Sequence, residues 1–170
     1  MPATADAALT ELDTARDAFE EALRGAPDAS LRFRPPGEDY ALGGLVIHVA
    51  EVLEKYTRVL EDIHDAGAGS VHEAAAPISE ADEALIRDGF GAEGRTSALQ
   101  RVRQAHADLS RAVRALPTDA FEHKTPIIYA GSSEPYPTSA ADVIGWVRGH
   151  YDEHVSQIGE LVEAWSQTTR

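Results

Sequence analysis

The chain has 170 residues, a length that fits one domain with a single hydrophobic core. Its formal net charge of -14 argues against binding to nucleic acid or to anionic lipid. The absence of cysteine excludes disulfides, a thiolate nucleophile and cysteine-ligated zinc sites. Residues 1–12 do not resemble a signal peptide, and no apolar run is long enough to span a membrane, so we expect a cytoplasmic protein.

Apolar residues at steps of three and four predict four long amphipathic helices. The first runs from about Thr4 to Arg24 and is stopped by the glycine and proline that follow it. A connector, Arg34-Pro35-Pro36-Gly37, then separates it from the second helix, because two prolines and a glycine cannot continue a helix. The second helix covers roughly Tyr40 to His64.

A long connection, from Asp65 to Arg95, follows the second helix. Within it, Ser79-Glu80-Ala81-Asp82 fits a capping box, which predicts a short helix that ends at about Asp88. The third long helix starts near Thr96 and ends before Pro117.

The helical period is lost from Thr118 to Pro137. Within this stretch, residues 125–129 are predicted to be extended and residues 131–137 to form a loop. Ser139-Ala140-Ala141-Asp142 is a second capping box and opens the fourth helix. Four amphipathic helices with one long connection between the second and third predict an all-α four-helix bundle, with residues 1–170 in one domain.

Two histidines, His150 and His154, lie in the apolar stripe of the fourth helix. That stripe consists of Val143, Val147, His150, His154, Ile158, Leu161 and Trp165. Imidazole nitrogens in a core need polar partners, and a divalent metal is one such partner for residues at i and i+4. His48, flanked by Leu45 and Val52 in the second helix, adds a third imidazole. Three histidines on two helices would leave a bound metal with an open position.

The same residues also fit core histidines that hydrogen-bond to carboxylates or backbone carbonyls, and pattern alone leaves both interpretations open. His106, in the stripe of the third helix, is better interpreted as a satisfied core histidine than as an additional ligand. His64, His72 and His123 lie at a helix end or in loops, where we expect them to be solvated. No residue pair stands out as a general acid and base, so no catalytic residue is predicted.

Three short segments resemble the DinB/YfiT family of metal-dependent bacterial proteins. The first is the Arg34–Gly37 connector, which leads into a histidine-containing helix at residues 45–53. The second, residues 142–146, opens the last helix. The third is His150-Tyr151-Asp152-Glu153-His154 followed by Gln157-Ile158, which is similar to the family's H-x-x-x-H-x-x-Q-I ending. One departure is Tyr40-Ala41, where the family often has Trp-Ser or Trp-Thr.

The resemblance implies a four-helix bundle in which His48, His150 and His154 bind a divalent metal, nickel or zinc. It further implies a homodimer that transfers a small thiol, such as bacillithiol or mycothiol, to an electrophile, or that uses mycothiol to isomerise maleylpyruvate. A thiol and an electrophile are therefore the expected partners. The alternative is a metal-binding stress-response protein or dimeric interaction module that catalyses no reaction.

Overall fold

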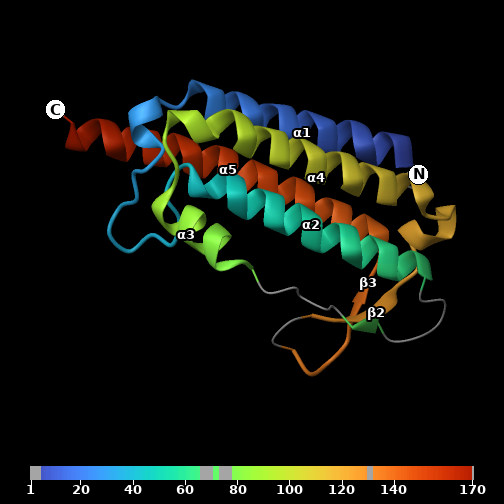
Figure 1. Ribbon diagram of the computed structural model, residues 1–170. Helices are drawn as coiled ribbons and strands as arrows, with labels where there is room; N and C mark the ends of the chain where they lie inside the picture. Colours follow the sequence, from blue (N-terminus) through green and yellow to red (C-terminus); the bar gives the residue numbers. More distant parts are fainter. Residues whose placement is uncertain (1–4, 66–70, 73–77, 130–131, 170) are drawn as a thin grey trace.

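Four long helices form the body of the protein in a computed structural model that describes residues 5–65, 71–72, 78–129 and 132–169 (Figure 1). The helices are α1 (Ala5–Gly25), α2 (Gly44–Asp65), α4 (Arg95–Ala115) and α5 (Ala140–Thr168). α1 packs along α5, and α2 packs along α4 and also contacts α5. The predicted all-α four-helix bundle is confirmed. The predicted start of the first helix, at Thr4, lies outside the described residues.

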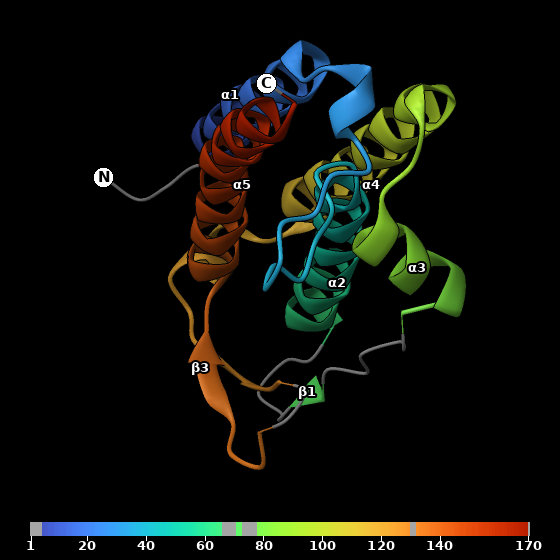
Figure 2. The same cartoon turned by 90° about the vertical axis from the view of Figure 1, so that its left-hand side faces the viewer.

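The long connection between α2 and α4 contains the predicted short helix, α3 (Glu80–Asp88). The backbone N–H of Asp82 donates to the Ser79 hydroxyl over 3.1 Å, which caps this helix at its N-terminus. α3 packs on α2 (Figure 2). Arg101 of α4 holds it there, because its guanidinium donates to Asp82 of α3 over 2.8 Å and to Glu54 of α2 over 3.2 Å. The described parts of the connections contain three single-turn 3-10 helices: Asp28–Ser30, Ala92–Gly94 and Thr118–Phe121.

A small sheet lies at one end of the bundle and consists of β1 (Val71–His72), β2 (Thr125–Ile128) and β3 (Tyr136–Thr138), in that order. β1 runs parallel to β2, and β3 runs antiparallel to β2, with Ile127 opposite Tyr136. The predicted extended segment is thus confirmed as β2. The predicted loop at residues 131–137 is wrong at its end, because Tyr136 and Pro137 pair with Ile127 and Pro126 of β2. β3 leads directly into α5 (Figure 2).

α2 begins at Gly44, four residues later than predicted, because the preceding residues bond to other segments. The N–H of Ala41 donates to the Ile86 carbonyl over 3.0 Å, and that of Gly43 to the Leu31 carbonyl over 2.8 Å. A Cβ on Gly44 would lie 1.9 Å from the same Ile86 oxygen, so only glycine allows α3 to approach this closely. The contact sets the position of the first turn of α2.

A buried hydrogen-bond chain joins three helices at the centre of the bundle. The Tyr151 hydroxyl of α5 lies 3.1 Å from Nδ1 of His106 in α4, and Nε2 of His106 lies 2.9 Å from Oδ1 of Asp13 in α1. A carboxylate only accepts, so Nε2 donates to Asp13, and Nδ1 accepts from Tyr151. Burial lowers the pKa of His106 and raises that of Tyr151, which keeps both groups neutral. His106 is therefore a satisfied core histidine, as expected.

Substitution of Tyr151 by phenylalanine tests this chain, because it leaves a buried acceptor on His106 without its donor. We expect Tyr151→Phe to lower the free energy of unfolding by about 1–3 kcal/mol, measured by urea denaturation. The matched control is Tyr136→Phe, since the Tyr136 side chain is 56% exposed and its substitution should change stability by less than about 0.5 kcal/mol. Equal stability of the Tyr151→Phe variant and the wild type would contradict the assigned hydrogen bond.

Candidate metal centre

Three histidine side chains from two helices meet at the α2–α5 interface. His48 lies in the second turn of α2, and His150 and His154 lie one turn apart on α5. The ring centroid of His48 lies 5.0 Å from that of His150 and 5.2 Å from that of His154, and the two rings on α5 are 4.3 Å apart. One ring nitrogen from each residue lies within 4.8 Å of the other two. The structure therefore brings together all three residues that the sequence singled out.

The spacing of the nitrogens fits a single small cation. Nε2 of His150 lies 3.2 Å from Nε2 of His154. Two imidazole nitrogens that bind one zinc ion at about 2.0–2.1 Å with tetrahedral angles are about 3.3–3.4 Å apart. This pair therefore needs almost no rearrangement to share an ion, and His48 approaches from the facing helix as the third donor.

Burial makes the three imidazoles uncharged at neutral pH. His154 is 3% exposed, and His48 and His150 are half-buried. Burial, together with the neighbouring His154, lowers the pKa of His48 to about 4. Burial and the two other histidines lower the pKa of His150 to about 3, and burial also lowers that of His154. Neutral imidazoles keep a lone pair on one nitrogen, which is the form that binds metals.

Gln157 orients one of the three rings. Its side-chain oxygen lies 2.8 Å from Nδ1 of His154, one turn earlier on the same helix. An amide oxygen accepts, so Nδ1 carries the proton and Nε2 presents its lone pair toward His150. In the sequence, Gln157 stands out only as part of the segment that is similar to the family's H-x-x-x-H-x-x-Q-I ending. The signal for its role was its i+3 spacing from a histidine in an apolar stripe.

Tyr40 packs against the histidine cluster, a contact that sequence analysis missed. Its ring centroid lies 4.6 Å from that of His48 and 6.3 Å from that of His154. Burial, with Asp39 and Glu153 nearby, raises the pKa of its hydroxyl, so the phenol stays protonated. Tyr40 stands where the resembling family often has tryptophan, and here it forms an aromatic wall beside two of the three imidazoles.

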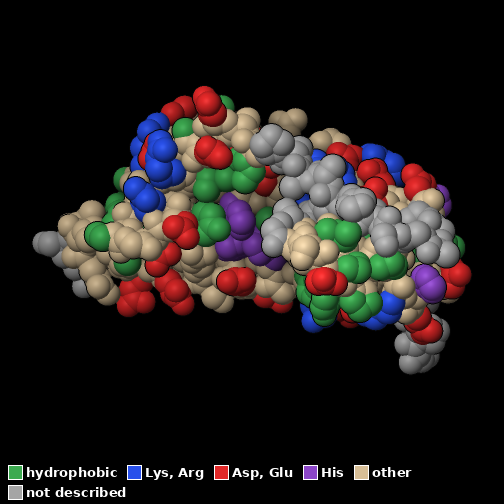
Figure 3. All heavy atoms as spheres, turned by 90° about the horizontal axis from the view of Figure 1, so that it is seen from below, with side chains coloured by type: hydrophobic (Ala, Val, Ile, Leu, Met, Phe, Trp, Pro, Cys, Tyr) green, Lys and Arg blue, Asp and Glu red, His purple; other side chains and the backbone are tan. Residues whose placement is uncertain are grey.

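The cluster opens to the surface on one side. Figure 3 shows histidine side chains in a hollow on one face of the molecule, among acidic and hydrophobic side chains. Half-burial of His48 and His150 agrees with this view. A group bound to the three nitrogens would therefore be accessible to a small molecule from solution.

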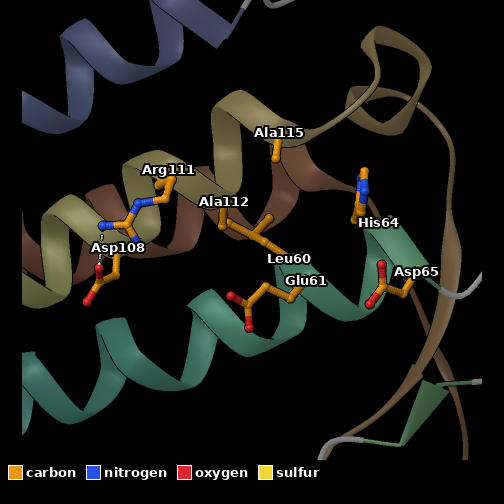
Figure 4. Close-up of a pocket in the computed structure, with 8 residues that line it drawn as sticks. All are labelled: Leu60, Glu61, His64, Asp65, Asp108, Arg111, Ala112 and Ala115. Atoms are coloured by element: carbon orange, nitrogen blue, oxygen red, sulfur yellow. Dashed lines mark ion pairs between the residues drawn. The ribbon is translucent and has the colours of Figure 1, made fainter.

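The remaining histidines lie elsewhere. His64 is exposed and lines an open pocket between α2 and α4, beside Asp65 and the ion pair of Arg111 with Asp108, 2.8 Å apart (Figure 4). His123 is exposed as well, which agrees with the expectation that both are solvated. The side chain of His72 lies outside the described residues. Within the described parts of the chain, the only group with metal-ligand geometry is the three-histidine cluster.

A helical bundle with a three-histidine cluster at one helix–helix interface defines a class of candidate metal-binding proteins. The family model for the DinB superfamily matches residues 11–158, and the chain belongs to that superfamily. The matched region includes His48, His150 and His154 as well as Gln157. A comparison with curated proteins finds no match to this chain. None of the described helices has the length and apolarity that crossing a bilayer requires.

Metal analysis of protein purified without a histidine tag tests the centre directly. We expect one tightly bound nickel or zinc ion per chain, measured by plasma mass spectrometry and by calorimetric titration of the chelator-treated protein. His150→Ala should abolish tight binding, because two imidazoles remain. His64→Ala is the matched control, since it removes an exposed histidine outside the cluster. Unchanged metal content in His150→Ala would overturn the assignment.

The stability of the metal-free protein should depend on pH in a defined direction. The folded-state pKa values of His48 and His150, about 4 and about 3, lie below the ordinary value of 6.5. As the pH falls below 6.5, the unfolded chain binds protons that the folded chain does not, so the free energy of unfolding falls. We expect this decline between pH 6.5 and 4 in urea denaturation with chelator present. His150→Gln should show a shallower decline than the wild type; parallel profiles would argue against the lowered pKa.

Proposed function

We propose that this protein is a divalent-metal-dependent enzyme that transfers a low-molecular-weight thiol to electrophilic compounds, in detoxification. His48, His150 and His154 hold the metal, which is nickel or zinc, and bacillithiol or mycothiol is the thiol. The observation that carries the proposal is the half-buried three-histidine cluster, open to solvent on one side (Figure 3). Three protein ligands are typical of catalytic rather than structural metal sites, because they leave one position for a substrate.

The chain's own residues account for several requirements of this reaction. The three neutral imidazoles provide the donor set, and Gln157 holds His154 in the tautomer with its lone pair on Nε2. Tyr40 packs against His48 and covers that side of the cluster. The sequence contains no cysteine, so the sulfur of any thiol reaction must come from a small molecule.

The chemistry needs no general base from the protein. A divalent cation held by His48, His150 and His154 would lower the pKa of a thiol bound beside it, and the thiol would then lose its proton to solvent at neutral pH. The sulfur then forms a bond to the electrophilic carbon, and the leaving group departs with its electron pair. The lack of a paired general acid and base in the sequence is consistent with this reaction class.

Conjugation of a fluorogenic electrophile tests the proposal. Purified protein is mixed with nickel or zinc, monobromobimane and either bacillithiol or mycothiol, and bimane fluorescence reports formation of the sulfur–carbon bond and release of bromide. We expect a metal-dependent rate well above the protein-free reaction for one of the two thiols. The rate should be lost in His150→Ala and retained in His123→Ala, which removes an exposed histidine. Metal binding without conjugation above background would instead favour a non-catalytic metal-binding protein.

A further inference from the structure

Four aromatic side chains gather on the surface next to the histidine cluster. They are Tyr56 of α2, Tyr129 after β2, Tyr136 of β3 and Trp146 of α5, and together they are called the aromatic platform. Trp146 lies at its centre: its ring centroid is 6.0 Å from that of Tyr56 and 6.1 Å from those of Tyr129 and Tyr136. The rings are tilted or edge-on to the indole, which are favoured arrangements for aromatic pairs, so the four side chains form one cluster around Trp146.

The platform is exposed, although aromatic side chains of this size are usually buried. Trp146 is 36% exposed and Tyr136 is 56% exposed. In the described parts of the chain only three large hydrophobic side chains reach such exposure, and these are two of them. Tyr129 is held in place, since its hydroxyl lies 2.9 Å from Oγ1 of the buried Thr138. A preorganised, exposed aromatic surface is characteristic of binding sites.

The platform continues the interface that carries the histidines. Trp146 precedes His150 by four residues, which places it one turn, about 6 Å, earlier along α5. Tyr56 follows His48 by eight residues, about 12 Å further along α2. His48 faces His150, and Tyr56, further along α2, faces Trp146, which comes earlier in α5. The two helices therefore run antiparallel. A molecule that lies across the platform therefore extends along the α2–α5 interface toward the three imidazoles.

Lys55 places an ammonium group over two rings of the platform. Its Nζ lies 5.6 Å from the ring centroid of Tyr56 and 5.9 Å from that of Tyr129. The chain has 15 lysine and arginine residues against 29 acidic residues, so a cation beside the platform is opposite in sign to the net charge of the molecule. Aromatic faces attract cations, and here Lys55 already supplies one. A further ligand is therefore favoured if it carries a negative charge that the ammonium group can attract.

We propose that the aromatic platform and Lys55 bind the electrophilic substrate, and that this substrate is a planar aromatic carboxylate. The rings stack against its π system, Lys55 attracts its carboxylate, and its reactive carbon lies toward His150. The identity of the ligand as the electrophile rests on the proposed transferase function. The binding itself requires neither metal nor thiol.

Tryptophan fluorescence tests the binding without relying on the metal centre. The chain has two tryptophans, so Trp165→Phe leaves Trp146 as the sole reporter. We titrate this variant, in chelator, with trans-cinnamate and expect saturable quenching. The matched control, Trp146→Phe, retains only Trp165, which lies nineteen residues further along α5, about 28 Å away, and should not respond. Absence of a saturable response in the Trp165→Phe variant would overturn the proposal.

Two further ligands test the chemical class. Cyclohexanecarboxylate has the charge of cinnamate without its π system, and phenyltrimethylammonium has an aromatic ring with the opposite charge. We expect both to bind the Trp165→Phe protein more weakly than cinnamate does. Equal or tighter binding of phenyltrimethylammonium would show that the platform is a site for cations, and equal binding of cyclohexanecarboxylate would show that stacking plays no part; either result contradicts the proposal.

Variants in the Trp165→Phe background assign the contacts. Lys55→Met should weaken cinnamate binding about five-fold, the effect of one partly exposed charge interaction. Tyr56→Leu should also weaken cinnamate binding, whereas Tyr56→Phe, which keeps the ring, should bind as the unsubstituted Trp165→Phe protein does. Equal affinities of the Tyr56→Leu and Tyr56→Phe variants would overturn the assignment of Tyr56. Melting curves show whether each variant is folded. We expect His150→Ala to lose the metal but still bind cinnamate. That result would show that this site is independent of the metal centre, so a failure of the transferase proposal could be told apart from a failure of the binding proposal.

Discussion

The hydrogen bond between Tyr151 and His106 is a directional constraint on how α5 is rotated about its own axis, in addition to its buried apolar stripe. Tyr151 is 1% exposed and carries a hydroxyl that must find a partner in the core, and His106, itself held by Asp13, is that partner. Successive residues on a helix point about 100° apart, so fixing Tyr151 toward α4 also fixes the direction of its neighbour His150. His150 and His154 then face α2 rather than the centre of the bundle. The hydrogen-bond chain is thus separate from the metal centre but helps to fix where its ligands point.

α2 is placed by an equally specific contact at its first turn. The close approach of Ile86 to Gly44 and the bonds of Arg101 to Asp82 and Glu54 tie α3 to α2 and α4. His48 lies one turn beyond this contact, opposite the two histidines of α5. The α2–α5 interface then has two adjoining parts, a histidine cluster for a metal and an aromatic surface with one lysine. In our account, the first part activates a thiol and the second part holds the molecule that it attacks.

Much of this arrangement follows from local sequence patterns. The apolar stripes predicted all four long helices, and the two capping boxes located the starts of α3 and α5. The histidines were found because they interrupt otherwise apolar stripes. The features that were missed depend on contacts outside their own segment: β3 forms only by pairing with β2, and the start of α2 is set by Ile86. Trp146 and Tyr136 look like ordinary packing residues in the sequence. Only the fold shows that both are exposed and that three tyrosines surround Trp146, next to the histidine cluster.

The central claim is that His48, His150 and His154 together ligate one metal ion. X-ray absorption spectroscopy of the zinc- or nickel-loaded protein counts imidazole ligands without depending on any assay of activity. Our account predicts outer-shell scattering from three imidazoles in the wild type and from two in His48→Ala. The remaining atoms bound to the metal should be nitrogen or oxygen. A spectrum that fits only oxygen ligands, or one that His48→Ala leaves unchanged, would contradict the account.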